Sequence, residues 1–197
     1  MQDWLSTLAF ALGPAWISGI NLYATVAVLG LLEHFGYAHL PGDLGVLGNW
    51  WVIGVAGVLY LVEFLADKIP LVDSVWDAVH TFIRIPAGAL LAATAFADFP
   101  PAMRIVAFLL GGSIALASHG TKAAVRVAVN TSPEPVSNIV VSTLEDVFAF
   151  IATLVLVWKP MVILIAALVF ACLAAWMAPK ILRAVRGLFG RGRAAAS

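Results

Sequence analysis

Long hydrophobic stretches alternate with short polar segments along the whole chain. A helix needs roughly 20 apolar residues to cross the hydrocarbon core of a bilayer. Six stretches approach or exceed this length, at about 5–32, 50–66, 71–96, 103–128, 138–157 and 161–178. The pattern therefore predicts an all-α, polytopic transmembrane helical bundle with about six spans.

Prolines inside two of these stretches predict broken helices. A proline removes a backbone donor and clashes with the preceding helical turn. Gly13-Pro14 interrupts the first stretch, so we expect a kinked span there, or a short initial piece followed by a full span. Residues 71–84 are amphipathic and precede Pro86, which predicts either one broken helix or an amphipathic helix followed by a short span.

Composition supports the membrane assignment. Hydrophobic residues make up 62% of the chain and charged residues only 11%, whereas soluble globular proteins are about 25% charged. These values exclude an ordinary soluble domain. We expect residues 1–183 to form a single transmembrane helical domain, with the lipid bilayer as its main partner.

The charge distribution indicates an orientation. The formal net charge is zero, but five basic residues follow the last apolar stretch: Lys180, Arg183, Arg186, Arg191 and Arg193. Because cytoplasmic segments beside membrane spans are enriched in Lys and Arg, we expect a cytoplasmic C-terminus, with residues 184–197 as a disordered basic tail. Six spans would place both termini on that side. Nucleic-acid binding is the competing interpretation of a basic tail, and the adjacent span disfavours it.

The densest group of ionisable residues lies at the start of the third stretch. Asp73, Asp77, His80 and Arg84 follow an i, i+4, i+7, i+11 spacing, which places them on one stripe of a helix that turns about 100° per residue. Charges in hydrocarbon cost several kcal/mol unless they pair or face water. This stripe must therefore face the protein interior or a hydrated cavity.

Three other apolar stretches carry polar stripes at helical spacing. Their members are Ser18, Asn21 and Thr25; His119, Lys122 and Arg126; and Asn138, Ser142 and Glu145, with Asp146 adjacent. We expect at least three helices to bring such side chains to one hydrated site. The candidate site residues are Asn21, Asp67, Asp73, Asp77, His80, Arg84, His119, Lys122, Arg126, Asn138 and Glu145. For Asp67-Lys68, at the end of a span, a solvated interfacial ion pair is the alternative.

The stripes suggest an internal repeat. Residues 18–25 align with 119–126, and residues 70–80 align with 135–145. Internal repeats that flank a midplane site, with broken helices at matching positions, are typical of many transporters. The two alignments use different offsets, however, so chance similarity between helices rich in small residues is the alternative.

Three segments resemble a known family. They are GINLYATV at 19–26, EFLADKIPLVDSVWDAVHTFIR at 63–84 and NTSPEPVSN at 130–138. Together they resemble an uncharacterised bacterial membrane family, domain of unknown function 4126, over most of the chain up to about residue 157. One departure is Ile85, which separates Arg84 from Pro86. The resemblance implies a polytopic protein of the bacterial inner membrane, and it carries over no activity and no catalytic residues.

The polar stripes favour transport as the function. A cavity lined by acidic, histidine and basic side chains suits a small polar or anionic solute, and an anionic lipid headgroup is one candidate cargo. Arg126 could hold an anion bidentately. Carboxylates and His80, whose imidazole titrates near neutrality, would carry coupling protons.

Two other functions are open. Buried salt bridges alone would suit a structural or accessory membrane protein. Asp73, Asp77 and His80, with His119 or Glu145, have the ligand chemistry of a metal-dependent intramembrane hydrolase, but no HExxH signature occurs. We expect neither an enzyme nor a metal or other cofactor. Gly111-Gly112 favours close helix packing, within one chain or in a homo-oligomer.

Overall fold

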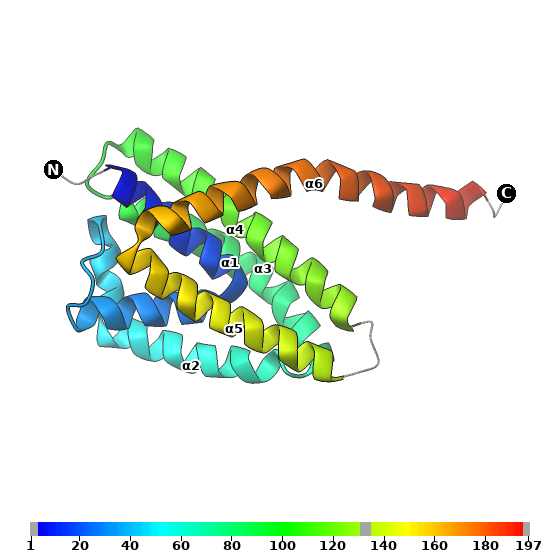
Figure 1. The fold of residues 1–197 in the computed structure, drawn as a ribbon, viewed down its shortest axis with the longest axis horizontal. Helices are drawn as coiled ribbons and strands as arrows, with labels where there is room; N and C mark the ends of the chain where they lie inside the picture. Colours follow the sequence, from blue (N-terminus) through cyan, green and yellow to red (C-terminus); the bar gives the residue numbers. More distant parts are fainter. Residues whose placement is uncertain (1–3, 131–134, 195–197) are drawn as a thin grey trace.

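The computed structural model describes residues 4–130 and 135–194, and every described element is a helix (Figure 1). The elements are α1 (Trp4–His34), the 3₁₀ helix η1 (Gly42–Gly48), α2 (Trp50–Ala66), α3 (Pro70–Ala95), α4 (Pro101–Asn130), α5 (Pro135–Trp158) and α6 (Pro160–Ala194). This confirms the predicted all-α helical bundle.

Four described helices, α3 to α6, are long and apolar enough to cross a membrane. A fifth span results if η1 and α2, which meet at an angle of 70°, are counted together. The chain is therefore a multi-pass membrane protein with four to five candidate spans, where the sequence pattern predicts about six.

The missing span is explained by α1, which is a broken hairpin. Asn21 has non-helical backbone angles (φ −143°, ψ 100°) and separates two short apolar helices, Trp4–Ser18 and Leu22–His34. Figure 1 shows the first half running into the middle of the bundle and the second half returning to the end where it began. The first apolar stretch thus enters and leaves at one end of the bundle.

The break lies at Asn21 and not at Gly13-Pro14, so the predicted position is wrong. Pro14 is inside a continuous helix. The Asn21 side-chain oxygen accepts a hydrogen bond from the backbone N–H of Ala24 at 2.9 Å, as the N-cap residue of the second half. Asparagine is among the best N-cap residues because its short side chain replaces a missing helical acceptor. Capping therefore determines where this helix breaks.

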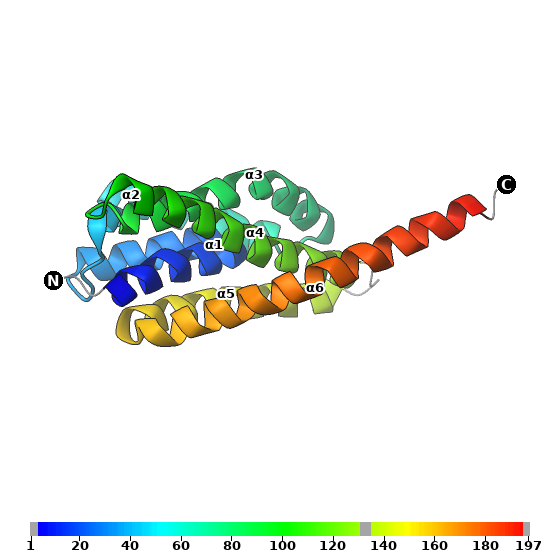
Figure 2. The ribbon, with the colours of Figure 1, turned by 90° about the horizontal axis from the view of Figure 1, so that it is seen from above.

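Glycine allows the tip of α1 to approach α4 closely. A Cβ atom on Gly19 would lie 1.8 Å from Ser118 Oγ and 2.7 Å from the carbonyl oxygen of Ala115. Figures 1 and 2 place α1 in the middle of the molecule, with the other helices around it, and α1 contacts every other element. The tip at residues 19–21 is therefore held at the centre of the bundle.

The predicted repeat is matched in one half only. Pro70 and Pro135 each begin a helix, and Figure 1 shows α3 and α5 running in the same direction. By contrast, α4 is helical through Lys122, so the break at Asn21 has no counterpart at the aligned position. The break predicted near Pro86 is also wrong, because α3 is one continuous helix, Pro70–Ala95, through this proline.

The polarity of the bundle is the reverse of that in a soluble protein. Arg84 and Arg126 are the largest fully buried side chains that the structure describes, whereas Phe82 and Leu65 are largely exposed. An apolar exterior is stable in lipid, and a charged interior then requires internal partners. This distribution agrees with the membrane assignment.

The last helix extends well beyond the bundle (Figure 2). Its span covers Pro160–Lys180, and the helix continues to Ala194. Residues 195–197 of the expected basic tail lie outside the described residues. The boundary expected at residue 183, and the disorder beyond it, stay predictions.

Candidate functional site

A cluster of buried charges occupies the interior beside the tip of α1. We define the charge network as five carboxylates and three cations: Glu63, Asp67, Asp73, Asp77 and Glu145 with Arg84, Lys122 and Arg126. They come from α2 and the turn after it, α3, α4 and α5. Each network side chain is at most 15% exposed. The predicted convergence of several helices on one spot is therefore found.

Arg84 links the network to the broken helix. Its Nη2 atom forms an ion pair with Glu63, and its Nη1 atom lies 3.6 Å from Asp77 Oδ1. The same Nη1 donates to the carbonyl oxygens of Ile20 at 3.0 Å and Gly19 at 3.3 Å. These carbonyls end the first half of α1, where a helix has no internal donors left. The guanidinium therefore stabilises the negative end of that half-helix.

Lys122 lies at the centre of the network. Its Nζ atom donates to the carbonyl oxygen of Ile20 at 3.2 Å. Four carboxylates also lie within 4 Å of it: Asp67 at 3.2 Å, Glu145 at 3.5 Å, Glu63 at 3.6 Å and Asp77 at 3.8 Å. The single positive charge of Lys122 thus partly compensates the negative charges of four carboxylates.

Arg126 joins α4 to α3, to α5 and to the turn after α2. Its Nη2 atom lies 3.0 Å from Asp67 Oδ2, 3.0 Å from Glu145 Oε2 and 3.6 Å from Asp73 Oδ1. Its Nη1 atom donates to Asn138 Oδ1 at 2.7 Å. Asn138 in turn donates to the backbone carbonyl of Asp67 at 2.9 Å. The predicted stripes of α4 and α5 therefore meet at this residue.

His80 lies at the edge of the cluster, against the second half of α1. Its Nδ1 atom is 2.8 Å from the carbonyl oxygen of Trp76, so Nδ1 carries a proton. Its Nε2 atom is 3.0 Å from the Tyr23 hydroxyl, and its ring stacks on Trp76. A neutral imidazole satisfies both hydrogen bonds.

His119 is also satisfied as a neutral ring. Its Nδ1 atom is 3.3 Å from Nη1 of Arg84, which can only donate, so Nδ1 is the acceptor. Its Nε2 atom then carries the proton and faces Thr81 Oγ1 at 2.8 Å and the carbonyl oxygen of Asp77 at 3.2 Å. His119 therefore adds no positive charge to the network in this arrangement, and the contacts of His80 require none.

One ion pair outside the network, between Lys68 and Asp146, lies beside it. Asp146 accepts from Asn21 Nδ2 at 2.9 Å and lies 3.5 Å from Lys68 Nζ. Lys68 also donates to Ser142 Oγ at 2.8 Å. The interpretation of Asp67-Lys68 as a solvated interfacial pair is thus wrong: Asp67 is 1% exposed, and Lys68 pairs across to α5. Chain reversal after α2 turns both side chains inward.

Carboxylates outnumber cations among these described side chains. The network has five carboxylates against three cations, and the flanking pair is balanced, so two negative charges are uncompensated when every group is ionised. Glu63 Oε2, Asp67 Oδ1 and both carboxylate oxygens of Asp77 are buried without a hydrogen-bond partner. Such groups are rare in native interiors.

The family is identified by a match over most of the chain. Residues 8–180 match the family model described as Domain of unknown function (DUF4126). This chain belongs to that family. The matched range includes the whole charge network and the broken helix. No curated protein and no solved structure matches the chain.

Sequence reasoning missed three charged residues of this DUF4126 protein: Glu63, Lys68 and Asp146. Glu63 is fully buried, and its spacing of four residues from Asp67 places both on one face of α2. That spacing was the available signal. Lys68 and Asp146 were visible as neighbours of site residues, but their partners depend on how α5 docks against the turn after α2.

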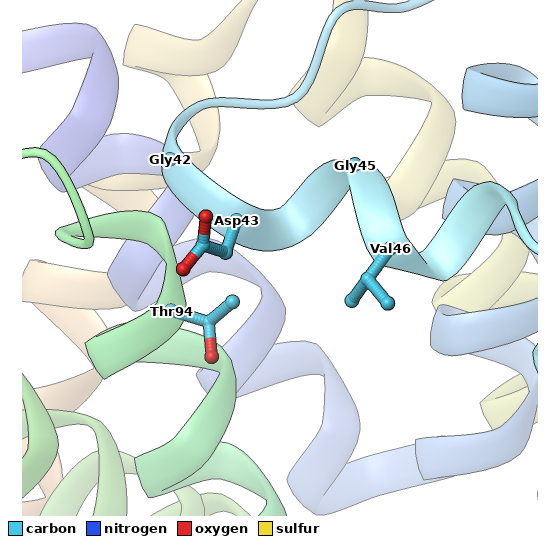
Figure 3. A pocket seen from close by; sticks show the side chains of 5 residues that line it. All are labelled: Gly42, Asp43, Gly45, Val46 and Thr94. Carbon is cyan, nitrogen blue, oxygen red and sulfur yellow. The ribbon is translucent and has the colours of Figure 1, made fainter.

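A surface pocket of this DUF4126 protein lies away from the network (Figure 3). It has a volume of about 600 Å³, and its lining residues are Gly42, Asp43, Gly45, Val46 and Thr94. It lies beside η1 and the end of α3, at the end of the bundle where α1 begins. The network itself is enclosed by protein, so the arrangement corresponds to a closed site.

A metal centre has no geometric support in the described part of the chain. No group of three or more His, Cys, Asp or Glu side chains there is placed to hold a metal ion. Cations next to every network carboxylate would also repel a multivalent metal ion. The network side chains themselves can form ion pairs and hydrogen bonds and can exchange protons.

Proposed function

We propose that this protein is a transporter or channel-like protein that moves a small polar solute or ion through the charge network. The observation that carries the proposal is the uncompensated charge of that network, buried beside the tip of a broken helix. Polar contacts between membrane helices average under 2 kcal/mol, and buried ion pairs are often no better than apolar packing. Stability alone therefore does not account for eight buried charges.

The broken helix supports the same function. Discontinuous helices in transporters place half-helix ends near the bilayer midplane, where carbonyls and N-termini bind ions and substrates. Here the carbonyls of Gly19 and Ile20 face Arg84 and Lys122. Asn21 caps the returning half and contacts α5 through Asp146. A shift of this tip would change contacts to α3, α4 and α5 together.

The charge balance narrows the class of solute. Every network cation already contacts at least two carboxylates, and the surplus charge is negative. A neutral polar or positively charged solute therefore fits the network better than the anionic solute or lipid headgroup expected from the sequence. We also propose that the protein lies in a bacterial inner membrane, and that its C-terminus is cytoplasmic because five basic residues lie in the part of α6 at and beyond the end of its span.

Purified full-length protein in vesicles tests the proposal. The probes are protons driven by a potassium diffusion potential and read with an entrapped pH dye, and radiolabelled sodium, an amino-acid zwitterion and a monosaccharide. We expect at least one probe to move faster than in protein-free vesicles. Glu145→Gln should lower that rate about tenfold or more, since Glu145 contacts both Arg126 and Lys122, whereas the exposed control Asp98→Asn should not.

One observation favours a structural protein as the second candidate. The network is buried, and each of its three cations is paired with carboxylates. If folded wild-type protein moves none of the four probes faster than protein-free vesicles, the transport proposal fails and the scaffold is preferred.

A further inference from the structure

We propose that the charge network takes up two monovalent positive charges from solution, as protons or alkali-metal cations, with Asp77 as the main acceptor. This deepens the proposed function by naming the ion class that the same site would bind, and its role in transport rests on that proposal. The starting point is the charge network itself, in which the described side chains comprise five carboxylates and three cations, a surplus of two carboxylates.

A buried surplus of this size needs compensation. An isolated ionised carboxylate in a low-dielectric interior is so unfavourable that it takes up a proton or a counter-ion. A divalent cation would also balance two charges, but no described group of three ligands is placed to hold one. The two charges are therefore most simply monovalent.

Among the four carboxylates within 4 Å of Lys122, the geometry selects Asp77 as the main acceptor. Its side chain is 6% exposed, and neither carboxylate oxygen has a hydrogen-bond partner. Its nearest cations are Arg84 at 3.6 Å and Lys122 at 3.8 Å. Asp67, by comparison, has cations at 3.0 and 3.2 Å from Oδ2. Asp77 is thus the more weakly compensated of the two carboxylates.

The surrounding groups do not supply the missing charge. Those that face Asp77 or its partners are Tyr23 of α1, Glu63 and Asp67 at the end of α2, Asp73, His80 and Arg84 of α3, His119, Lys122 and Arg126 of α4, and Glu145 of α5. His119 is hydrogen-bonded as a neutral ring, and the hydrogen bonds of His80 are satisfied without a second ring proton. Arg84, Lys122 and Arg126 are already included in the charge balance of the network.

Infrared spectroscopy of the full-length protein in nanodiscs tests the inference. The C=O stretch of a protonated carboxyl is distinct from that of a carboxylate, and an H₂O-to-D₂O shift identifies it. In a neutral buffer with choline as the only cation, we expect a signal equivalent to two protonated carboxyls. Replacement of choline by sodium or potassium then shows whether the positive charge is supplied by protons or by alkali-metal cations. Loss of the signal with proton release identifies an alkali cation, and an unchanged signal identifies protons.

The result that overturns the inference is the absence of any protonated carboxyl in choline buffer. Asp77→Asn removes one negative charge, so its signal should correspond to one carboxyl fewer, whereas Asp98→Asn should match wild type. If Asp77→Asn does not fold, the wild-type signal still decides the question. The infrared measurement is made at equilibrium and does not depend on transport. Charge uptake without flux would therefore refute the transport proposal but not this inference. Flux without charge uptake would refute this inference but not the transport proposal.

Discussion

Arg84 shows what a buried charge does in this protein. It is fully buried, pairs with Glu63 and holds the carbonyls of Gly19 and Ile20. Three helices, α1, α2 and α3, thus depend on one guanidinium. Its planar donors allow these contacts simultaneously, which the single ammonium of a lysine at this position would not reproduce.

Replacing Arg84 alone should be severe. Arg84→Met leaves Glu63 as an uncompensated buried charge, and breaking a buried ion pair in this way costs about 3–5 kcal/mol. The double variant Glu63→Met/Arg84→Met removes both charges and should recover part of that loss. Unfolding of the purified variants in detergent would measure the coupling. Equal stability of the single and double variants would contradict the assigned pairing.

The sequence predicted residues better than it predicted their partners. Helical spacing alone placed Asp77, Arg84, Lys122 and Arg126 on inward stripes, because charges on a membrane helix have few other stable positions. It could not show which carboxylate faces which cation, since this depends on helix register. Glu63 was missed because its only signal was the spacing of four residues from Asp67, and two charges at the end of an apolar stretch did not define a stripe.

At the scale of elements, the break in α1 positions the tip of the hairpin beside the network. Its location was mispredicted because Pro14 is the stronger local signal, whereas Asn21 determines the break through capping and through its bond to Asp146. The second of these contacts joins residues far apart in the sequence. No local pattern could have revealed it.

Asn21→Ala should therefore destabilise the protein by about 2 kcal/mol, from the lost cap and the unsatisfied Asp146 oxygen. Asn21→Ser keeps a capping oxygen with a shorter side chain and should lie between alanine and wild type. Thermal unfolding of the three proteins provides the comparison. An alanine variant as stable as wild type would show that the cap does not hold the hairpin.

Packing between α3 and α4 depends on small residues. A Cβ atom on Gly111 would lie 2.4 Å from the Ala92 Cβ atom and 2.7 Å from the Gly88 carbonyl oxygen. Gly111→Ala should thus cost about 1–3 kcal/mol by overpacking. Gly120 is the matched control in the same helix, since a Cβ there has no neighbour within 4 Å. Gly120→Ala should stabilise the helix by up to about 1 kcal/mol, and the reverse order of the two variants would contradict this packing.

At the scale of the whole molecule, the hairpin changes the topology. Because α1 enters and leaves at one end, the first described residues and the end of α6 lie at opposite ends of the bundle (Figure 1). Six complete spans would have placed them on the same side. Hydropathy measures length and apolarity, and a hairpin of two short helices has both without crossing the membrane.

Cysteine labelling tests this topology. In a background with Cys172, the only cysteine, replaced by serine, we expect Trp4→Cys, at an exposed position, and Arg183→Cys to react with a membrane-impermeant reagent from opposite sides. The basic residues at and beyond the end of the α6 span predict that position 183 is cytoplasmic. Labelling of both positions from the same side would restore the six-span topology.

The central claim is that the charge of Asp77 serves binding or transport more than folding. The most direct test is to measure stability and flux of Asp77→Asn on the same preparation, in the vesicle assay with the probe that wild type moves. We predict a free energy of unfolding within about 1 kcal/mol of wild type, because the Asp77 oxygens lack hydrogen bonds, together with a flux at least tenfold lower. A loss of about 3 kcal/mol or more, or a flux equal to that of wild type, would contradict the account.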